Sequence, residues 1–334
     1  MKATRTRNAL PITLVMLVSG AFAAAAAERP SMAGPEIRWE TPAEGFVTAK
    51  TLTTYRAVPV SRVSDEQARE RLDVLREATG TKGRFDGLKR IDGRLIFTSE
   101  EDASSVFDID SATGTFLFNS GLKGYSDEGA TRGLPSLKEA PETAREYLAK
   151  LRYLPMNEKE LVVERVGGLA MAAAKEGKTS EPYHKLVTVY FGRVIDGLRV
   201  QGRGSRILVH LGENSALVGV IRSWAEVKPQ EIDRDDVKRD DLILREIDRR
   251  LFRMADRARE VVIREAELVL FDDGRGVVEP AIHVVATARY EGPQRAKEGT
   301  EIPVDFYVPA LLRSEAYYPF IQDAEARWPG GEKE

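Results

Sequence analysis

The feature that most constrains the fold of this chain is an Asp196-Gly197 pair set between two apolar runs. Apolar side chains alternate with others over residues 187–191 before the pair and over residues 198–200 after it. A two-residue type I′ turn needs positive φ at both central residues, which Asp and Gly tolerate. The pattern therefore predicts a β-hairpin. The structural signature of this hairpin and the corner after it is Asp196, Gly197, Val200 and Gly202.

The glycines around this hairpin do not complete a nucleotide-binding motif. Gly202 and Gly204 begin a G-x-G-x-x-G pattern, but Ile207 stands where the third glycine is required. A phosphate loop ending at Lys178 would need a glycine at the position of Ala172. We therefore expect no cofactor, and we expect the glycines to permit a bulge or bend before the next strand.

Helical periodicity occurs in three stretches of the sequence. The first, residues 64–80, opens with Ser64 and Gln67 at the spacing of a capping box. The second covers residues 140–155 and the third residues 234–260. The apolar stripe expected along the third helix is Leu244, Ile247, Leu251, Ala255 and Ala258.

Strand-like segments joined by short turns follow each helical stretch. Such turns favour antiparallel pairing, because parallel strands need crossovers of a dozen residues or more. The order of helix and then antiparallel strands recurs about three times along the sequence. This predicts an α+β fold of repeated helix-on-antiparallel-sheet units.

The N-terminus has the order of a secretory signal peptide. Lys2, Arg5 and Arg7 are followed by an apolar run over residues 9–20 and by small residues over 21–27. We therefore expect an exported protein, periplasmic or extracellular, with no membrane span in the mature chain. The sequence contains no cysteine, which excludes disulfides, thiol nucleophiles and thiolate metal sites.

These patterns suggest an organisation along the whole chain. The expected parts are a signal peptide (1–27), an N-terminal tail and first strand (28–59), helix-and-sheet units (60–130, 136–229 and 232–312) and a C-terminal tail (313–334).

The sequence "VTVYFGRVIDGLRVQGRGSRILVHLGENSALVGVIRSW" resembles the core of propeptide modules found ahead of thermolysin-type and fungalysin-type metalloproteases. The shared corner is Gly197, Leu198, Val200 and Gly202. "FDIDSATGTFLF" is similar to the strand-turn-strand ending of the related PepSY modules, and "VVEPAIHVV" and "FYVPALL" resemble strand entries of the same superfamily. The resemblance implies a non-catalytic module that binds a protease and restrains or assists it. The chain departs from the usual arrangement because it contains no H-E-x-x-H motif, which leaves the partner open.

The candidate chemical residues favour structural roles. His184, His210 and His283 do not have the i,i+4 spacing of two metal ligands on one helix face, so we expect no metal site. In the D-x-D sequence of Asp108 and Asp110 no threonine follows at the position that phosphatase-like chemistry needs, so we expect a plain turn. A turn is also expected at Asp272-Asp273-Gly274.

A basic stretch at the corner is the candidate partner-binding edge. Its residues are Arg193, Arg199, Arg203, Arg206 and Trp224. An exposed strand there could be extended by a partner's strand, or the arginines could guard the edge against aggregation. For Tyr317, Tyr318 and Phe320 the sequence leaves both a core position and an exposed patch open.

The resulting functional hypothesis is an exported, non-enzymatic binding module that regulates another envelope or extracellular protein, such as a protease. One alternative is a carrier of an apolar ligand between sheet and helices, which needs a cavity of several hundred cubic ångströms. Another is a hydrolase that uses unrecognised acidic residues in a cleft. Nucleic acid is not expected as a partner, because the formal net charge is −3.

Overall fold

The computed structural model describes most of the chain beyond its N-terminus. The described residues are 34–40, 45–125, 131–172, 174–175, 178–179, 183–290 and 300–318. Internal contacts divide the chain into Met1–Ala33 and Gly34–Glu334, and every described residue belongs to the second unit. The predicted signal peptide, Phe320 and most of the predicted C-terminal tail lie outside the described residues.

The described residues contain α-helices at all three predicted places. They are α1 (Asp65–Thr79), α2 (Ala140–Lys150) and α3 (Asp240–Met254). Short 3-10 helices are η1 (Ala49–Leu52), η2 (Leu122–Tyr125), η3 (Glu158–Glu160), η4 (Glu213–Ser215) and η5 (Arg234–Asp236). No helix in this part of the chain is both long and apolar enough to cross a membrane.

The start of α1 is as predicted, whereas the bounds of α3 are not. At α1 the Ser64 hydroxyl accepts from the Gln67 amide and the Gln67 side chain accepts from the Ser64 amide, so the capping box is confirmed. The third helix begins only at Asp240, and Glu260 already begins a strand. Its buried face includes Ile243 in place of the predicted Leu244, which is only partly buried.

Seventeen strands account for most of the regular structure in the described residues. Their bounds are β1 (Glu36–Trp39), β2 (Thr53–Ala57), β3 (Gly87–Ile91), β4 (Arg94–Thr98), β5 (Val106–Asp110), β6 (Phe116–Asn119), β7 (Leu161–Met171), β8 (Ala174–Lys175), β9 (Lys178–Thr179), β10 (Tyr183–Ile195), β11 (Leu198–Gly202), β12 (Arg206–Leu211), β13 (Leu217–Ser223), β14 (Val227–Glu231), β15 (Glu260–Asp272), β16 (Val277–Tyr290) and β17 (Thr300–Pro309). Only β8 and β9 stand apart, as a pair, and the other 15 strands belong to one sheet.

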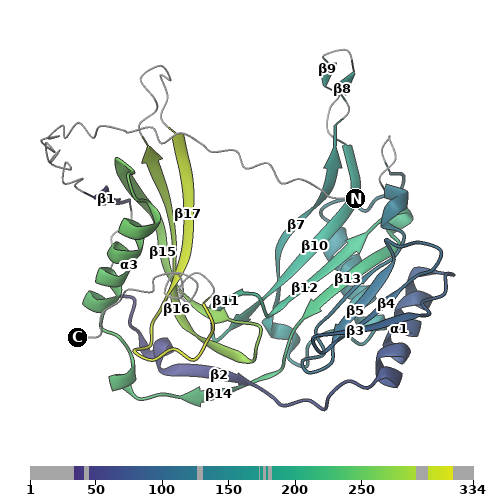
Figure 1. Ribbon diagram of the computed structural model, residues 1–334, viewed down its shortest axis with the longest axis horizontal. Helices are drawn as coiled ribbons and strands as arrows, with labels where there is room; N and C mark the ends of the chain where they lie inside the picture. The colour runs from purple at the N-terminus through teal and green to yellow at the C-terminus, as the bar shows by residue number, and fades with distance from the viewer. Residues whose placement is uncertain are drawn as a thin grey trace, which may run out of the picture. The chain divides into compact units, whose positions relative to one another are not determined.

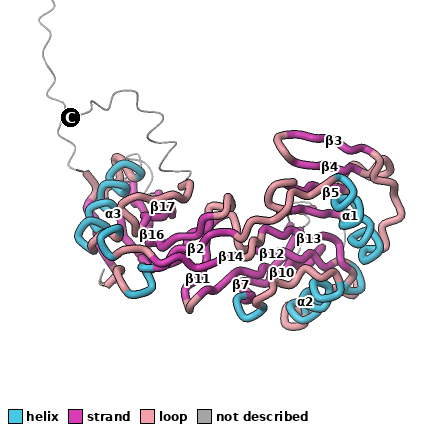
Figure 2. The backbone as a smooth tube through the Cα atoms, turned by 90° about the horizontal axis from the view of Figure 1, so that it is seen from below, coloured by secondary structure: helices cyan, strands magenta, loops and turns pink. Residues whose placement is uncertain are grey.

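The sheet is mixed and continuous. Its main path runs β14-β2-β16-β15-β11-β10-β12-β13-β6-β5-β4-β3, while β1 pairs with β15, β17 with β16 and β7 with β10. Most neighbours are antiparallel, but β1 and β11 pair with β15 in parallel. Figures 1 and 2 show β2 and β14 side by side, as their pairing requires.

The predicted fold class is therefore wrong. The chain is mostly β, with one mixed sheet in place of repeated helix-on-antiparallel-sheet units. Two long-range pairings explain the difference: β6 pairs with β13, and β11 continues the sheet to β15. Short turns indicate which neighbouring strands form hairpins, but they carry no signal for pairings between strands far apart in the sequence.

Two large apolar clusters hold the helices against the sheet. In the first, Leu72 of α1 and Leu148 of α2 pack with Phe107, Phe118 and Phe191 from three strands. This cluster thus combines residues from the stretches predicted as separate units at 60–130 and 136–229. In the second, α3 packs with β15, β16 and β17, beside which it lies in Figure 1. Burial of apolar area in these clusters is the main favourable contribution to folding.

The predicted hairpin is confirmed. Asp196 and Gly197 have φ values of 50° and 77°. Across the turn Ile195 pairs with Leu198. After β11 the chain bends and β12 resumes pairing with β10, where Phe191 faces Ile207. No helix begins near Gly204.

Candidate functional site

The bend between β11 and β12 closes around a carboxylate. The Arg203 amide donates to the Asp272 carbonyl at 2.9 Å, and the Ser205 hydroxyl donates to the Asp272 carboxylate at 2.6 Å. A Cβ on Gly202 would lie 2.2 Å from the Asp272 carbonyl oxygen. A Cβ on Gly204 would lie 2.2 Å from the Asp272 carboxyl group. These two glycines therefore permit a close approach between distant segments of the same chain.

Asp272 is 6% exposed and is the last residue of β15, where the turn to β16 begins. Its other carboxylate oxygen accepts from the Gly274 amide at 2.9 Å, and Gly274 has a φ of 74°. Burial raises the pKa of Asp272, while the hydrogen bonds from Ser205 and Gly274 oppose the rise. The turn predicted at Asp272-Asp273-Gly274 is confirmed, and its first residue also holds the bend of β11.

A second buried carboxylate fastens the segment after β17. Glu279 is 1% exposed and accepts from the Tyr318 hydroxyl at 3.2 Å and from the amides of Glu315 and Ala316. Burial raises the pKa of Glu279. Tyr318 is buried and stacks on Phe271 with ring centres 4.2 Å apart, so it belongs to the core.

Tyr317 has a different environment from its neighbour. Its ring lies under the Arg275 guanidinium at 4.0 Å, and its amide donates to the Asp273 carboxylate at 3.2 Å. The backbone donors on Asp273 and Glu279 show that these carboxylates position chain segments. In the described residues no group of three or more His, Asp or Glu side chains is placed to hold a metal ion.

The residues predicted as a partner-binding edge do not form one exposed surface. Arg193 is 1% exposed, pairs with Glu160 at 2.6 Å and lies over the Trp224 ring at 4.8 Å. Trp224 is 5% exposed. β11 pairs with β10 on one side and with β15 on the other, so it lies inside the sheet and not at its edge. Three of the predicted residues are exposed: Arg199, Arg203 and Arg206.

The histidines lie apart from one another. His210 is hydrogen-bonded to Thr188 at 2.9 Å, and burial lowers the pKa of its imidazole. His283 lies 3.0 Å from an Asp305 carboxylate oxygen on the neighbouring strand. His184 is exposed at the start of β10.

The D-x-D residues have local partners as well. Asp108 pairs with Arg94 at 2.8 Å, whereas Asp110 accepts from the amides of Ala112 and Thr113. The second of these carboxylates closes a plain turn, as predicted.

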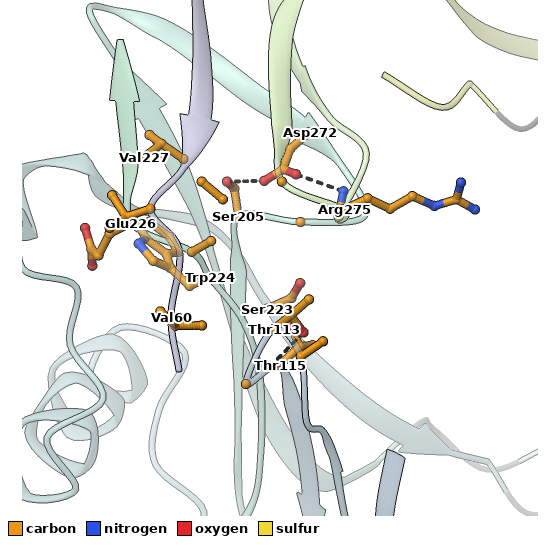
Figure 3. Close-up of a pocket in the computed structure, with 18 of the residues that line it drawn as sticks. Val60, Thr113, Thr115, Ser205, Ser223, Trp224, Glu226, Val227, Asp272 and Arg275 are labelled. Carbon is orange, nitrogen blue, oxygen red and sulfur yellow. Dashed lines mark hydrogen bonds between the residues drawn. The ribbon is translucent and has the colours of Figure 1, made fainter. Parts of the chain in front are cut away.

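A pocket of about 400 Å³ was not anticipated from the sequence. It is lined by residues 57–61, Val63, Arg71, 112–115, 204–205, 222–227, Asp272, 274–276 and Val278. We call it the Trp224 pocket. Figure 3 shows Asp272 and Ser205 toward one end and Thr113 and Ser223 toward the other, with Trp224 between.

Two arginines that line the Trp224 pocket form no ion pair within the described residues. Arg71 makes no ion pair or hydrogen bond within the described residues. Arg222 donates to the carbonyls of Tyr153 at 3.1 Å and Trp224 at 3.0 Å. Burial lowers the pKa of Arg222, Glu226 opposes this change, and the nearby charge of Arg71 reinforces it.

Comparisons with known proteins assign no family. No protein-family model matches the sequence, and no curated protein matches it. Among solved structures, the chain is similar to an uncharacterized protein from Eubacterium rectale at 9% sequence identity. The match covers 79% of this chain and 85% of that one, with a TM-score of 0.46, so it carries no argument about function. The propeptide and PepSY resemblance gains no support here, and nothing in the described residues or the comparisons indicates an enzymatic activity.

Proposed function

We propose that this chain is an exported, non-enzymatic binding protein whose ligand occupies the Trp224 pocket. The observation that carries the proposal is the pocket itself, with a volume of about 400 Å³. Ligand sites are concave, span roughly 300–1,000 Å³ and combine apolar walls with a few polar groups. Val60 and Trp224 supply apolar surface here, while Arg71 and Ser223 supply polar groups.

The walls of the pocket are held in place without a ligand. The Ser205 hydroxyl is hydrogen-bonded to Asp272, which holds residues 204–205 in place. The lining residues at the end of β2 and at the start of β14 are held because these two strands pair with each other. Arg193 supports the Trp224 ring and donates to the Ala225 carbonyl at 2.9 Å. A preformed pocket loses little conformational freedom on binding, which favours affinity.

The pocket also discriminates between the functional alternatives. A carrier of a purely apolar ligand needs its cavity between sheet and helices, where the two apolar clusters lie. The two carboxylates that line the pocket do not favour a hydrolase, because both oxygens of Asp272 accept hydrogen bonds from the protein and Glu226 accepts from the Met156 amide. The sequence resemblance suggested that the chain regulates another exported protein. Such a role is compatible with a pocket that binds part of that partner.

A pocket-filling variant tests the proposal. Ser223 is half-buried and lines the pocket, so Ser223→Phe should occupy it. Thermal unfolding is measured with a panel of small organic acids, amides, alcohols and amines. We expect at least one class to raise the midpoint of the native protein and to lose this effect in Ser223→Phe, because a ligand stabilises only the state that binds it.

Leu137→Phe is the control, because Leu137 is 50% exposed and does not line the pocket. It should respond to the panel as the native protein does. If no class stabilises the native protein, or if every stabilising compound acts equally on Ser223→Phe, the proposed function is wrong.

A further inference from the structure

One end of the Trp224 pocket carries positive charge. Arg71 comes from α1 and lies beside the β5–β6 turn, where its guanidinium would be 3.5 Å from a Cβ on Gly114. Arg222 comes from β13, and its strand neighbour across the ladder is Phe116, at the end of the same turn. Two segments that are distant in sequence thus each bring an arginine to the lining of one pocket, and the charge of Arg71 acts on Arg222.

Among the described residues, no acidic side chain forms an ion pair with Arg71 or Arg222. The charge of Glu226 acts on Arg222, but in the same part of the chain Glu226 makes no ion pair, and its carboxylate accepts from the Met156 amide at 3.1 Å. Asp272 lies toward the other end and is already bonded to Ser205. Arg275 also lines the pocket, but its guanidinium stacks on the Tyr317 ring.

Such an arrangement costs free energy unless an anion neutralises it. Two half-buried cations repel each other and have lost part of their hydration without gaining a counter-ion. A guanidinium presents a planar fork of donors that fits a carboxylate or phosphate. The hydroxyl of Ser223 has no hydrogen-bond partner in the described residues, and Ser223 also lines the pocket.

The rest of the pocket is suited to a hydrocarbon group. Its lining includes the apolar residues Val58, Pro59, Val60, Trp224 and Val227. Val60 is 60% exposed, so a ligand that covers it removes apolar surface from water.

We propose that the Trp224 pocket binds an organic anion with an apolar body, its acidic group held by Arg71 and Arg222 and its body against Val60 and Trp224. This inference rests on the proposed function and adds the chemical class of the ligand to it. A charge-assisted, bidentate contact is shorter and about twice as strong as a neutral hydrogen bond. The acidic group therefore carries the specificity, and the apolar body adds affinity.

Isothermal titration calorimetry with three probes of one chain length tests the inference. The probes are octanoate, octyl phosphate and the neutral octanamide. We expect octanoate to bind at least about tenfold more tightly than octanamide, the ratio that a charge-assisted contact supplies. In Arg71→Gln this preference should disappear. In Arg71→Lys, which keeps the charge, part of it should remain.

The matched control is Arg69→Gln, on the same helix but exposed and not lining the pocket, which should keep the full preference. Tighter binding of octyl phosphate with the same dependence on Arg71 supports the inference and identifies a phosphate as the acidic group. Equal binding of octanoate and octanamide, both lost in Ser223→Phe, overturns the charge assignment and leaves the proposed function intact. Binding of inorganic phosphate as tight as that of octanoate overturns the role of the apolar body.

Discussion

The Ser205 hydroxyl donates a 2.6 Å hydrogen bond to the buried carboxylate of Asp272, 67 residues away in the sequence. This bond ties the bend after β11 to the turn after β15, beside the parallel pairing of the same two strands. Both residues also line the Trp224 pocket. The region in which β11 joins β15 therefore also lines the proposed binding site.

The close approach at this contact depends on Gly204. We expect Gly204→Ala to lower the free energy of unfolding by about 1–3 kcal/mol, because the new methyl group would overlap the Asp272 carboxyl group. Urea denaturation measures the change. Gly167→Ala is the control, since a Cβ on Gly167 meets nothing within 4 Å, and it should change stability by less than about 0.5 kcal/mol. Equal effects of the two substitutions would contradict the packing described here.

The burial of Asp272 predicts a pH dependence of stability. Its pKa is raised in the folded state, so its contribution is fully present below the unfolded value of about 4 and is lost as pH rises through the folded value. Asp272→Asn removes this ionisation, and the Ser205 hydroxyl can reverse its role toward the new amide. The stability of Asp272→Asn relative to the native protein should therefore increase as pH rises from about 4 toward neutrality.

Urea denaturation across this pH range measures that difference. A difference between Asp272→Asn and the native protein that stays constant with pH would show that the Asp272 carboxyl group titrates alike in both states.

We expect Arg193 to stabilise the fold and not to bind a partner at the protein surface. Arg193→Met should cost about 3 kcal/mol or more, because it leaves Glu160 without its partner and removes the contact with Trp224. Arg199→Met, at an exposed position, should change stability by less than about 0.5 kcal/mol. The midpoints of thermal unfolding compare the two variants, and a small effect at both would mean that the buried ion pair does not form.

The two tyrosines after β17 offer a matched pair of substitutions. Tyr318→Phe should lower stability by about 1–3 kcal/mol, since it leaves the buried Glu279 carboxylate with one donor fewer. Tyr317→Phe should have almost no effect, because the Arg275 contact uses the ring and not the hydroxyl. Denaturant unfolding measures both, and a larger loss for Tyr317→Phe would contradict the described anchoring of this segment.

Local signals in the sequence were reliable guides to local structure. The Asp196-Gly197 turn and the Ser64 capping box form as predicted, because each depends on the conformation of only a few neighbouring residues. The third helix is shorter than its periodicity indicated, since Glu260 and the residues after it pair with β16. Competition from long-range pairing decided the helix boundary.

The architecture and the pocket depend on contacts between distant residues, which no local sequence pattern indicates. The parallel pairing of β11 with β15 joins stretches that turn signals had placed in separate units. Arg193 looked like part of a basic edge, but Glu160 and Trp224 bury it within the fold. Arg71 stood out in no motif, because its significance arises only where α1 meets the β5–β6 turn and Arg222.

A crystal structure of the protein grown with octanoate tests the central proposal most directly. We expect the carboxylate to lie within hydrogen-bond distance of Arg71 and Arg222 and the hydrocarbon chain to contact Trp224 and Val60. An empty Trp224 pocket at saturating octanoate, with Arg71 paired to a carboxylate of the protein itself, would contradict the proposal.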